Sequence, residues 1–214
     1  MALLGHSLAR VTTMQFEAGR GQVQTGDVTK KSLREAALVR RDALSAAERR
    51  SASQAIAARR FPVPLGEGTV VAGYSPIRGE CDPVPLMRSL AAKGVQLALP
   101  VVVSRDRPLT FSEWRQGAQL VAGPFGILQP GPQAMDVEPD IILVPLVAFD
   151  RACRRIGYGA GFYDRTLADL RKRRVVVAVG IAFAAQEVEA VPAGEHDERL
   201  DCVLTEREVI DFRS

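Results

Sequence analysis

Four near-continuous apolar runs constrain the fold of this chain more than any other feature. They stand at 69–75 (TVVAGYS), 96–103 (QLALPVVV), 139–150 (PDIILVPLVAFD) and 174–183 (RVVVAVGIAF). Strands that are apolar on both faces are typical of parallel sheets covered by helices. Because helical patterns separate these runs, the sequence predicts an α/β fold: a three-layer α/β/α sandwich with a mostly parallel, Rossmann-like sheet.

Two N-terminal helices are expected before the first strand. Thr29 can cap the first helix, and Ser45 with Glu48 has the spacing of a capping box for the second. The inner face of the first helix would hold Leu33, Ala36, Ala37 and either Val39 or Arg40. Its basic residues are expected on a solvated face: Lys30, Lys31, Arg34, Arg40 and Arg41. The inner face of the second helix would hold Ala47, Ser51, Ala55, Ile56 and Ala58.

The remaining elements continue the alternation. Asp82 and Pro83 are expected to open a helix that ends near Lys93, and another helix is expected at 162–173. LTFSEW, at 109–114, has a strand pattern inside an irregular section, 104–139, that we expect to lie across one face of the sheet. The short apolar run at 202–204 predicts an edge strand.

Composition bounds the domain organisation and the location. A chain of 214 residues, 47% of them hydrophobic, predicts one α/β domain at 29–214, and the aperiodic residues 1–28 predict a disordered tail. That tail has no apolar stretch long enough for a membrane span or a signal peptide. The three cysteines form no CxxC pair, which indicates a reducing compartment and argues against a zinc site. We therefore expect a cytoplasmic, monomeric protein with no membrane partner.

A glycine-rich stretch, RRIGYGAGFYDR at 154–165, carries the clearest chemical signal. Glycines at alternate positions can turn successive backbone N–H groups toward one phosphate, and a helix that follows adds its positive end. Asp164 stands where a carboxylate could bind Mg²⁺ held by the same phosphates. A tight turn between a strand and a helix would use the same glycines. The spacing GxGxG fits neither the Rossmann fingerprint nor a Walker A loop.

Motifs spread along residues 29–208 resemble one known family, the 5-formyltetrahydrofolate cyclo-ligases, also called 5,10-methenyltetrahydrofolate synthetases. The matching stretches are KKSLR at 30–34, the residues Gly79, Glu80 and Asp82, FSEW with PFGI, VPLVAFD, RIGYGAGFYDR, and His196 with Asp197. The chain departs from the family pattern at three positions: Ile156 stands where leucine is usual, Cys153 where glycine is common, and Gln129 where an acid is often found.

The resemblance implies a folate-directed ATP- and Mg²⁺-dependent reaction, the cyclisation of 5-formyltetrahydrofolate to 5,10-methenyltetrahydrofolate with release of ADP and phosphate. Position by position, it implies ATP contacts at Lys30, Lys31, Ser32, Leu33 and Arg34, and at Arg155, Ile156, Gly157, Tyr158, Gly159, Ala160, Gly161, Phe162 and Tyr163. It implies folate contacts at Ser75, Glu80, Tyr158, Gly159, Ala160, Gly161 and Phe162. Asp164 and Asp197 match Mg²⁺ ligands, and the catalytic roles fall to Lys30, Arg155 and Asp164.

Structural roles compete with several of these assignments. Asp164 could pair with Arg165 on its own helix, Asp197 could be a turn residue, and Glu80 could be a first-turn acid. Tyr163 and Trp114 could belong to the core. At the level of function, the rivals are an ATP-dependent enzyme that activates another formamide or carboxylate, and a non-catalytic module that binds folate. A third rival, nucleic-acid binding through 171–174, lacks aromatic residues within that basic run, and we expect no nucleic-acid partner.

Overall fold

A seven-stranded sheet forms the centre of the computed structural model, which describes residues 29–213. The predicted tail at 1–28 lies outside the described residues. The strands are β1 (Val70–Ala72), β2 (Gln96–Val101), β3 (Thr110–Glu113), β6 (Ile141–Pro145), β9 (Val177–Ile181), β10 (Cys202–Leu204) and β11 (Val209–Asp211), in the order β11-β10-β9-β6-β1-β2-β3. The five central strands are parallel, and β3 and β11 are antiparallel edges. The mostly parallel α/β fold is confirmed.

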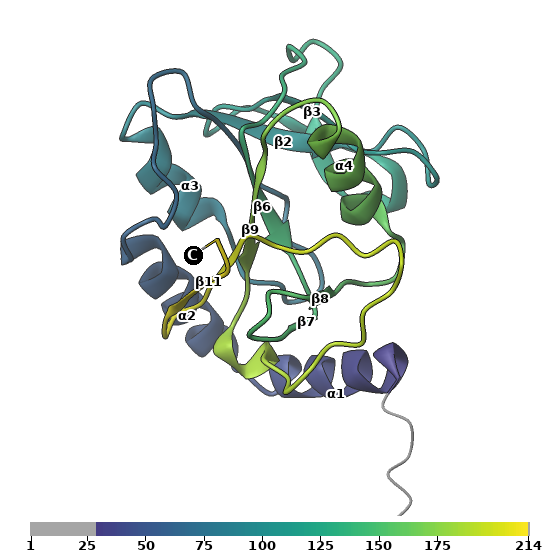
Figure 1. Cartoon of the computed structure of the whole chain (residues 1–214). Helices are drawn as coiled ribbons and strands as arrows, with labels where there is room; N and C mark the ends of the chain where they lie inside the picture. Colours follow the sequence, from purple (N-terminus) through teal and green to yellow (C-terminus); the bar gives the residue numbers. More distant parts are fainter. Residues whose placement is uncertain (1–28, 214) are drawn as a thin grey trace, which may run out of the picture.

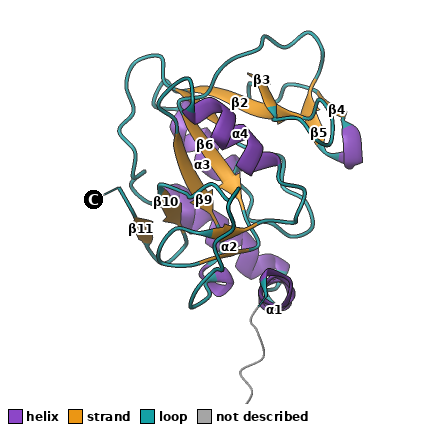
Figure 2. Ribbon diagram, turned by 45° about the vertical axis from the view of Figure 1, so that its right-hand side comes forward, coloured by secondary structure: helices purple, strands orange, loops and turns teal. Residues whose placement is uncertain are grey.

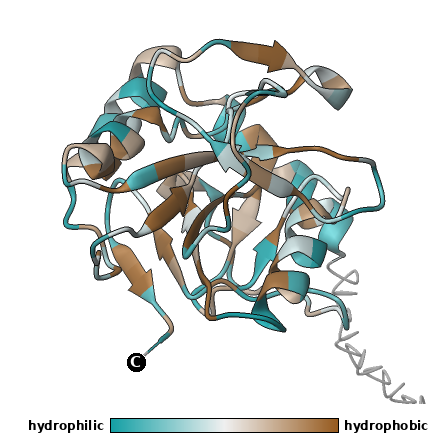
Figure 3. Cartoon of the chain, turned by 90° about the horizontal axis from the view of Figure 1, so that it is seen from above, coloured by the Kyte–Doolittle hydropathy of each residue, from teal (hydrophilic) through white to brown (hydrophobic). Residues whose placement is uncertain are grey.

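Helices cover both faces of the sheet (Figures 1 and 2). Alternate residues of β6 point to opposite faces, as a strand requires. Ile141 and Leu143 share a buried cluster with α2 (Ala46–Ala58) and α3 (Val84–Ala91), whereas Ile142 and Val144 share another with α4 (Phe162–Arg171). Figure 3 shows the strands as a hydrophobic interior between these layers. The predicted three layers are therefore present.

Residues 202–204 do not form the predicted edge. The hydroxyl of Thr205 accepts hydrogen bonds from the backbone amides of Arg207 and Glu208, which closes a tight turn directly after β10. The chain then runs back as β11, and Val203 pairs with Ile210. Because β11 is only three residues long, its strand pattern was not recognised in the sequence. The prediction that 202–204 forms the edge strand was therefore wrong, since the edge strand is β11.

The first helix, α1 (Lys30–Asp42), lies below the sheet in Figure 1, against β7 (Ala148–Phe149) and β8 (Arg155–Ile156). Thr29 caps it as predicted, because its hydroxyl accepts a hydrogen bond from the amide of Ser32. Ala37 is buried, but Val39 is 71% exposed and Arg40 is exposed as well, so the prediction that one of them faces inward was wrong. The inward position is Arg41, because it follows Ala37 by four residues and so shares its face.

The second helix, α2, begins with the predicted capping box between Ser45 and Glu48. Its buried face is formed by Ser53 and Ile56, whereas the residues predicted to face inward with Ile56 are exposed: Ala47, Ser51, Ala55 and Ala58. Ile56 fixes the orientation of the helix, since it is the largest apolar side chain available. The position three residues earlier, Ser53, then turns inward with it.

The apolar run at 139–150 divides into two elements instead of one strand. The central strand β6 ends at Pro145, and β7 pairs antiparallel with β8 to form a short hairpin. The side-chain amide of Gln186, which ends the 3₁₀ turn η2 (Ala184–Gln186), donates hydrogen bonds to the carbonyls of Leu146 and Val147. This bonding satisfies the backbone where the chain leaves the sheet. The hairpin is what carries the glycine-rich loop beyond the carboxyl edge of the sheet.

The irregular section at 104–139 contains a second small hairpin, β4 (Leu120–Ala122) and β5 (Leu128–Pro130), joined by the 3₁₀ turn η1 (Pro124–Gly126). It is bonded to the carboxyl ends of two central strands, since Ser75 donates to the carbonyl of Leu128 at 2.6 Å and the amide of Val102 donates to Gln129 at 3.2 Å. The section therefore reaches the sheet at its carboxyl edge, not across a face as predicted. In α/β sheets this edge is where ligands bind.

Candidate active site

The glycine-rich loop, residues 157–161, connects β8 to α4. Gly159 (φ +99°) and Gly161 (φ +67°) adopt left-handed backbone conformations, whereas Gly157 has an ordinary φ and open space around it. Within the described residues, the amides of 158–161 donate to no protein group. These N–H groups precede the positive end of α4, an arrangement that suits an anion such as a phosphate.

Helix α1 supplies the basic side chains around this loop. Arg34 donates from Nε to the carbonyl of Gly157 at 2.8 Å, and its guanidinium also lies next to Gly159. Lys30, one turn earlier on the same face, forms an ion pair with Asp197. The helix that sequence analysis placed first in the domain therefore reaches both the loop and the segment before β10.

The two predicted metal ligands are held in adjacent ion pairs. Asp164 forms an ion pair with Arg155 at 2.9 Å and accepts a hydrogen bond from the amide of Glu198 at 3.1 Å, both at Oδ1. Asp197 accepts from Lys30 and from the amide of Gly194, both at Oδ2. Partial burial acts to raise the pKa of Asp197, but the bonds from Lys30 and Gly194 outweigh it and the pKa falls below its usual value. Asp197 is thus suited to remain anionic.

This pair of carboxylates fits a Mg²⁺ ion that also binds phosphate. In each of them the second oxygen has no hydrogen-bond partner among residues 29–213. The same part of the chain holds no cluster of three or more acidic, histidine or cysteine side chains that would form a complete metal cage. Mg²⁺ commonly uses one or two carboxylates and takes its other ligands from water and phosphate. The donors present match that mode of binding.

Glu80 occupies the turn after β1, in surroundings that disfavour its charge. Burial raises its pKa to about 7, and the hydrogen bond from the amide of Ile77, at 2.8 Å, offsets only part of this effect. The carboxylate also contributes to the raised pKa of Tyr158 and Tyr163, for which burial is the main cause. Glu80 therefore faces the same region as the aromatic residues of the loop.

The other predicted site residues differ in what their side chains can reach. Ser32 is used in the cap of α1, Lys31 is exposed, and Leu33 packs against the cluster of β7 and β8. Ile156 is buried in that cluster, so a ligand could meet only its backbone. The carbonyl of Ala160 accepts from Arg165. Phe162 lies 6.2 Å from Phe125, centroid to centroid, and Tyr163 packs against the cluster under α4.

Sequence analysis missed two residues that organise the site. Arg41, predicted on a solvated face, is 2% exposed and donates from Nη1 to the hydroxyl of Tyr158 at 2.6 Å. Asp150, also 2% exposed, accepts from the amides of Ala152, Arg154 and Val191, so it shapes the turn between β7 and β8. The spacing of Lys30, Arg34, Ala37 and Arg41 along one helical stripe was a signal for Arg41.

The departures from the family pattern have structural explanations. Cys153 has φ +55°, the left-handed region that glycine adopts most easily, so the glycine common in the family suits this turn. Gln129 uses its side-chain oxygen to accept from the amide of Val102, a bond that a carboxylate could also accept.

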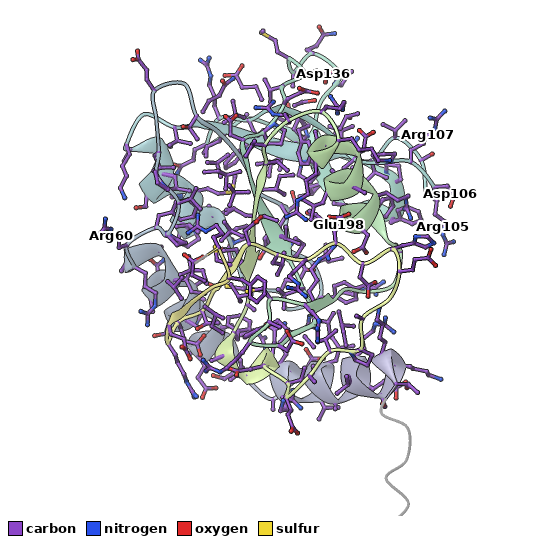
Figure 4. All side chains as sticks on the ribbon, viewed as in Figure 1. Arg60, Arg105, Asp106, Arg107, Asp136 and Glu198 are labelled. Carbon is purple, nitrogen blue, oxygen red and sulfur yellow. The ribbon has the colours of Figure 1, made fainter. Side chains whose placement is uncertain are left out.

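The basic run at 171–174 is compensated by acidic side chains. Arg171 pairs with Glu198 and Asp201. Arg173 and Arg174 both pair with Glu138, and they pair further with Asp169 and Asp140, respectively. Figure 4 shows Glu198 beside α4. None of the helices within residues 29–213 has the length and apolar character needed to cross a membrane.

Comparison with known sequences decides the family. A sequence model of the 5-formyltetrahydrofolate cyclo-ligase family matches residues 27–206. The chain belongs to this family. A cyclo-ligase of Mycolicibacterium smegmatis is 33% identical over 185 residues, covering 83% of this chain and 93% of the relative. The cyclo-ligase of Escherichia coli K12 is 34% identical over 176 residues, covering 79% and 96%.

Solved structures of family members agree with the fold. The Aquifex aeolicus 5,10-methenyltetrahydrofolate synthetase matches with a TM-score of 0.71 and 34% identity, covering 86% of this chain and 93% of that chain. The synthetase of Mycoplasma pneumoniae matches with a TM-score of 0.65 and 26% identity, covering 84% and 99%. The family match therefore spans residues 27–206, and it marks the protein as an enzyme of folate metabolism, a ligase.

Proposed function

We propose that this protein catalyses the ATP- and Mg²⁺-dependent cyclisation of 5-formyltetrahydrofolate to 5,10-methenyltetrahydrofolate, with release of ADP and phosphate. The observation that carries the proposal is the meeting of three segments, α1, the glycine-rich loop and residues 194–198, through Lys30, Arg34, Asp164 and Asp197. Together they offer cations, unpaired amides and two carboxylates in one place. That combination suits a nucleotide triphosphate with its metal ion.

In this proposal the loop amides and the N-terminus of α4 bind phosphate oxygens. Arg34 keeps the loop in shape through the carbonyl of Gly157. Lys30 neutralises phosphate charge once Asp197 has turned from Lys30 to the metal ion. Arg155 orients Asp164 through their ion pair. The side chain of Arg155 is 5% exposed, forms the ion pair with Asp164 and donates to the carbonyl of Glu198, so it would hold the proposed metal ligand in position.

The folate is proposed to lie on the opposite side of the loop, near Glu80, Tyr158 and Phe162. A carboxylate can accept hydrogen bonds from ring N–H groups, and aromatic side chains can stack on a pterin. Burial that raises the pKa of Glu80 to about 7 also excludes competing water. Binding of N–H donors would then favour the charged form, which couples the ionisation of Glu80 to substrate binding.

Bound ATP would transfer its γ-phosphoryl group to the formamide oxygen with release of ADP, and Mg²⁺ would neutralise the phosphate charge, so that the poor leaving oxygen of the formamide departs as phosphate. The N10 amine then attacks the activated carbon, the carbon–oxygen bond breaks, and N10 loses its proton. The residues of this chain align and neutralise; a protein nucleophile is not required. This division of labour agrees with the ion pairs and amides that line the site.

Two alternatives remain as proposals to be tested against this one. An enzyme acting on another formamide or carboxylate would use the same phosphate site but not require folate. A non-catalytic folate-binding module would need Glu80 and Tyr158 but not the paired carboxylates. Nucleic-acid binding is disfavoured because Arg171, Arg173 and Arg174 already pair with carboxylates.

We propose a monomeric, cytoplasmic enzyme, and sedimentation would test the monomer.

The product offers a direct assay, since its amidinium conjugation shifts ultraviolet absorbance away from that of the substrate. Mixing the protein with 5-formyltetrahydrofolate, ATP and Mg²⁺ is expected to produce this absorbance, and omitting any one of them is expected to abolish it. Turnover of ATP with another formamide and none with folate would support the first alternative. Tight folate binding without turnover would support the second.

A further inference from the structure

Arg41 is the most completely buried cationic side chain in the part of the chain that the structure describes. Its side chain is 2% exposed, although it lies on the first helix among other basic residues. Desolvating a guanidinium is costly unless its donors are satisfied. Arg41 must therefore be held by a well-matched set of acceptors, and those acceptors come from two different loops of the site.

The first contact fixes the glycine-rich loop. Arg41 donates from Nη1 to the hydroxyl oxygen of Tyr158 at 2.6 Å, and its guanidinium carbon lies 6.0 Å from the centre of the Tyr158 ring. An arginine has no acceptor, so the phenol oxygen must accept. The hydroxyl hydrogen of Tyr158 has no protein acceptor among residues 29–213, which leaves it free to donate to a ligand.

The second contact fixes the turn that presents Glu80. Arg41 donates from Nη2 to the carbonyl of Arg78, and its guanidinium lies against Gly79. Arg78 has φ +48° and Gly79 has φ +77°, so this turn uses left-handed conformations at consecutive positions. A non-glycine residue is strained in this conformation, which persists only when neighbouring groups hold it. Arg41 is one such group.

The remaining donors of Arg41 meet its neighbour on the helix. Nε and Nη2 both bond to Oδ1 of Asp42, at 3.0 and 2.9 Å, and the Asp42 side chain is 61% exposed. The carboxylate thus compensates the charge from the solvent side. The guanidinium group is held between Tyr158 and the 78–80 turn by hydrogen bonds to both. Its N–H donors have a fixed planar arrangement that a lysine ammonium cannot reproduce.

We infer that Arg41 is a positioning residue for the reaction: it holds Tyr158 of the glycine-rich loop and the turn of Glu80 in a fixed relation, so that both meet the same folate. This inference rests on the proposed function for its kinetic consequence but not for its structural one. Arg41 itself touches neither ATP nor folate in this account. It acts through the two loops that it connects.

Arg41→Lys tests the inference, with Arg40→Lys as the matched control. Arg40 is adjacent on α1 and also donates to backbone carbonyls, those of Ala185 and Glu187, but it contacts neither loop. Hydrogen exchange of the unliganded protein is expected to accelerate in Arg41→Lys, and not in Arg40→Lys, at two protected amides of these loops: that of Glu80, which bonds to the carbonyl of Ile77, and that of Arg165, which bonds to the carbonyl of Gly161. This readout does not depend on any activity.

Kinetics test the consequence. Arg41→Lys is expected to lower kcat/KM for the folate by about tenfold to a hundredfold, with the KM for ATP changed less than twofold or so. Tyr158→Phe removes the hydroxyl that accepts from Arg41. The double variant Arg41→Lys with Tyr158→Phe is therefore expected to have a kcat/KM for the folate no lower than that of the more impaired single variant. Unchanged exchange at the amides of Glu80 and Arg165, or additive losses in the double variant, would overturn the inference. Absence of cyclisation in the unaltered protein would instead refute the proposed function and leave the exchange result to decide the role of Arg41.

Discussion

Lys30, the first residue of α1, forms an ion pair with Asp197, which follows it by 167 positions in the chain. Each side chain is about one-third exposed, so the pair is partly solvated and can be exchanged for other partners. Beside it, Arg155 pairs with Asp164 at 2.9 Å with the arginine almost fully buried. One pair is thus adaptable and the other is fixed, which would suit the proposed binding of a metal ion and a polyphosphate.

Lys30→Ala is expected to raise the KM for ATP by roughly tenfold, because a cation beside the phosphates is lost. The free energy of unfolding should change by less than about 1 kcal/mol, since the ion pair is partly exposed. Initial rates at varied ATP concentration measure the first effect and urea denaturation the second. Lys93→Ala, an exposed lysine at the end of α3, is the charge-matched control. An unaltered KM for ATP in Lys30→Ala would remove Lys30 from the nucleotide site.

Asp164→Asn is expected to abolish Mg²⁺-dependent turnover while preserving the fold. Asparagine keeps an acceptor for Arg155 and for the amide of Glu198, whereas alanine would leave the buried guanidinium unpaired. Asp169→Asn, on the same helix and paired with Arg173 at the surface, is the control and should retain activity. The measurement is product absorbance at increasing Mg²⁺, with circular dichroism for the fold. Full turnover by Asp164→Asn would contradict its role as a metal ligand.

The glycines of the loop are expected to respond unequally to alanine. At Gly161, a Cβ would lie 2.7 Å from Arg165 and φ is +67°, and at Gly159 φ is +99°. Gly159→Ala and Gly161→Ala should therefore each lower the free energy of unfolding by roughly 1 kcal/mol or more. Gly157→Ala, in ordinary backbone and open space, should change it by less than about 0.5 kcal/mol. Urea denaturation of the three variants checks this order, and equal losses at all three positions would contradict it.

Glu80 is expected to make stability fall with pH. Burial raises its pKa from 4.5 to about 7, so between these values the folded protein binds more protons than the unfolded chain. The free energy of unfolding therefore decreases as pH rises through this window and levels off above about pH 7, a loss of at most about 3 kcal/mol. Glu80→Gln should remove the fall in the free energy of unfolding that comes from Glu80. Glu67→Gln, at an exposed site, should leave that fall unchanged. Denaturation at about pH 5 and about pH 8 compares the three proteins, and parallel losses would contradict the burial of Glu80.

The fold could be predicted where a strand is buried on both faces of the sheet, because such a strand is a near-continuous apolar run in the sequence. The runs at 96–103 and 174–183 became central parallel strands because nothing but a covered sheet can bury them. The division of the run at 139–150 into β6 and the β7–β8 hairpin was not predictable. It depends on Gln186, which satisfies the backbone where the strand ends, and that partner comes from a turn far along the chain.

The site was predictable where motifs are local, and not where partners are distant. The loop at 157–161 and Asp164 are adjacent in sequence, so their proximity could be predicted from spacing, and their joint role stays a prediction. Arg41 was assigned to solvent because its helix is rich in basic residues, whereas its partner Tyr158 lies 117 positions away. A charge pattern reports the exposed residues of a helix, and only the tertiary contact shows which arginine is turned inward.

The balance between ATP consumed and folate cyclised tests the central claim most directly. With 5-formyltetrahydrofolate and Mg²⁺ present, ADP measured by chromatography and product measured by absorbance are expected to form in equal amounts, and ADP formation should stop when the folate is omitted. In Asp164→Asn, neither ADP nor product is expected to form. Sustained ADP formation without folate, or product formation without ATP, would contradict the account.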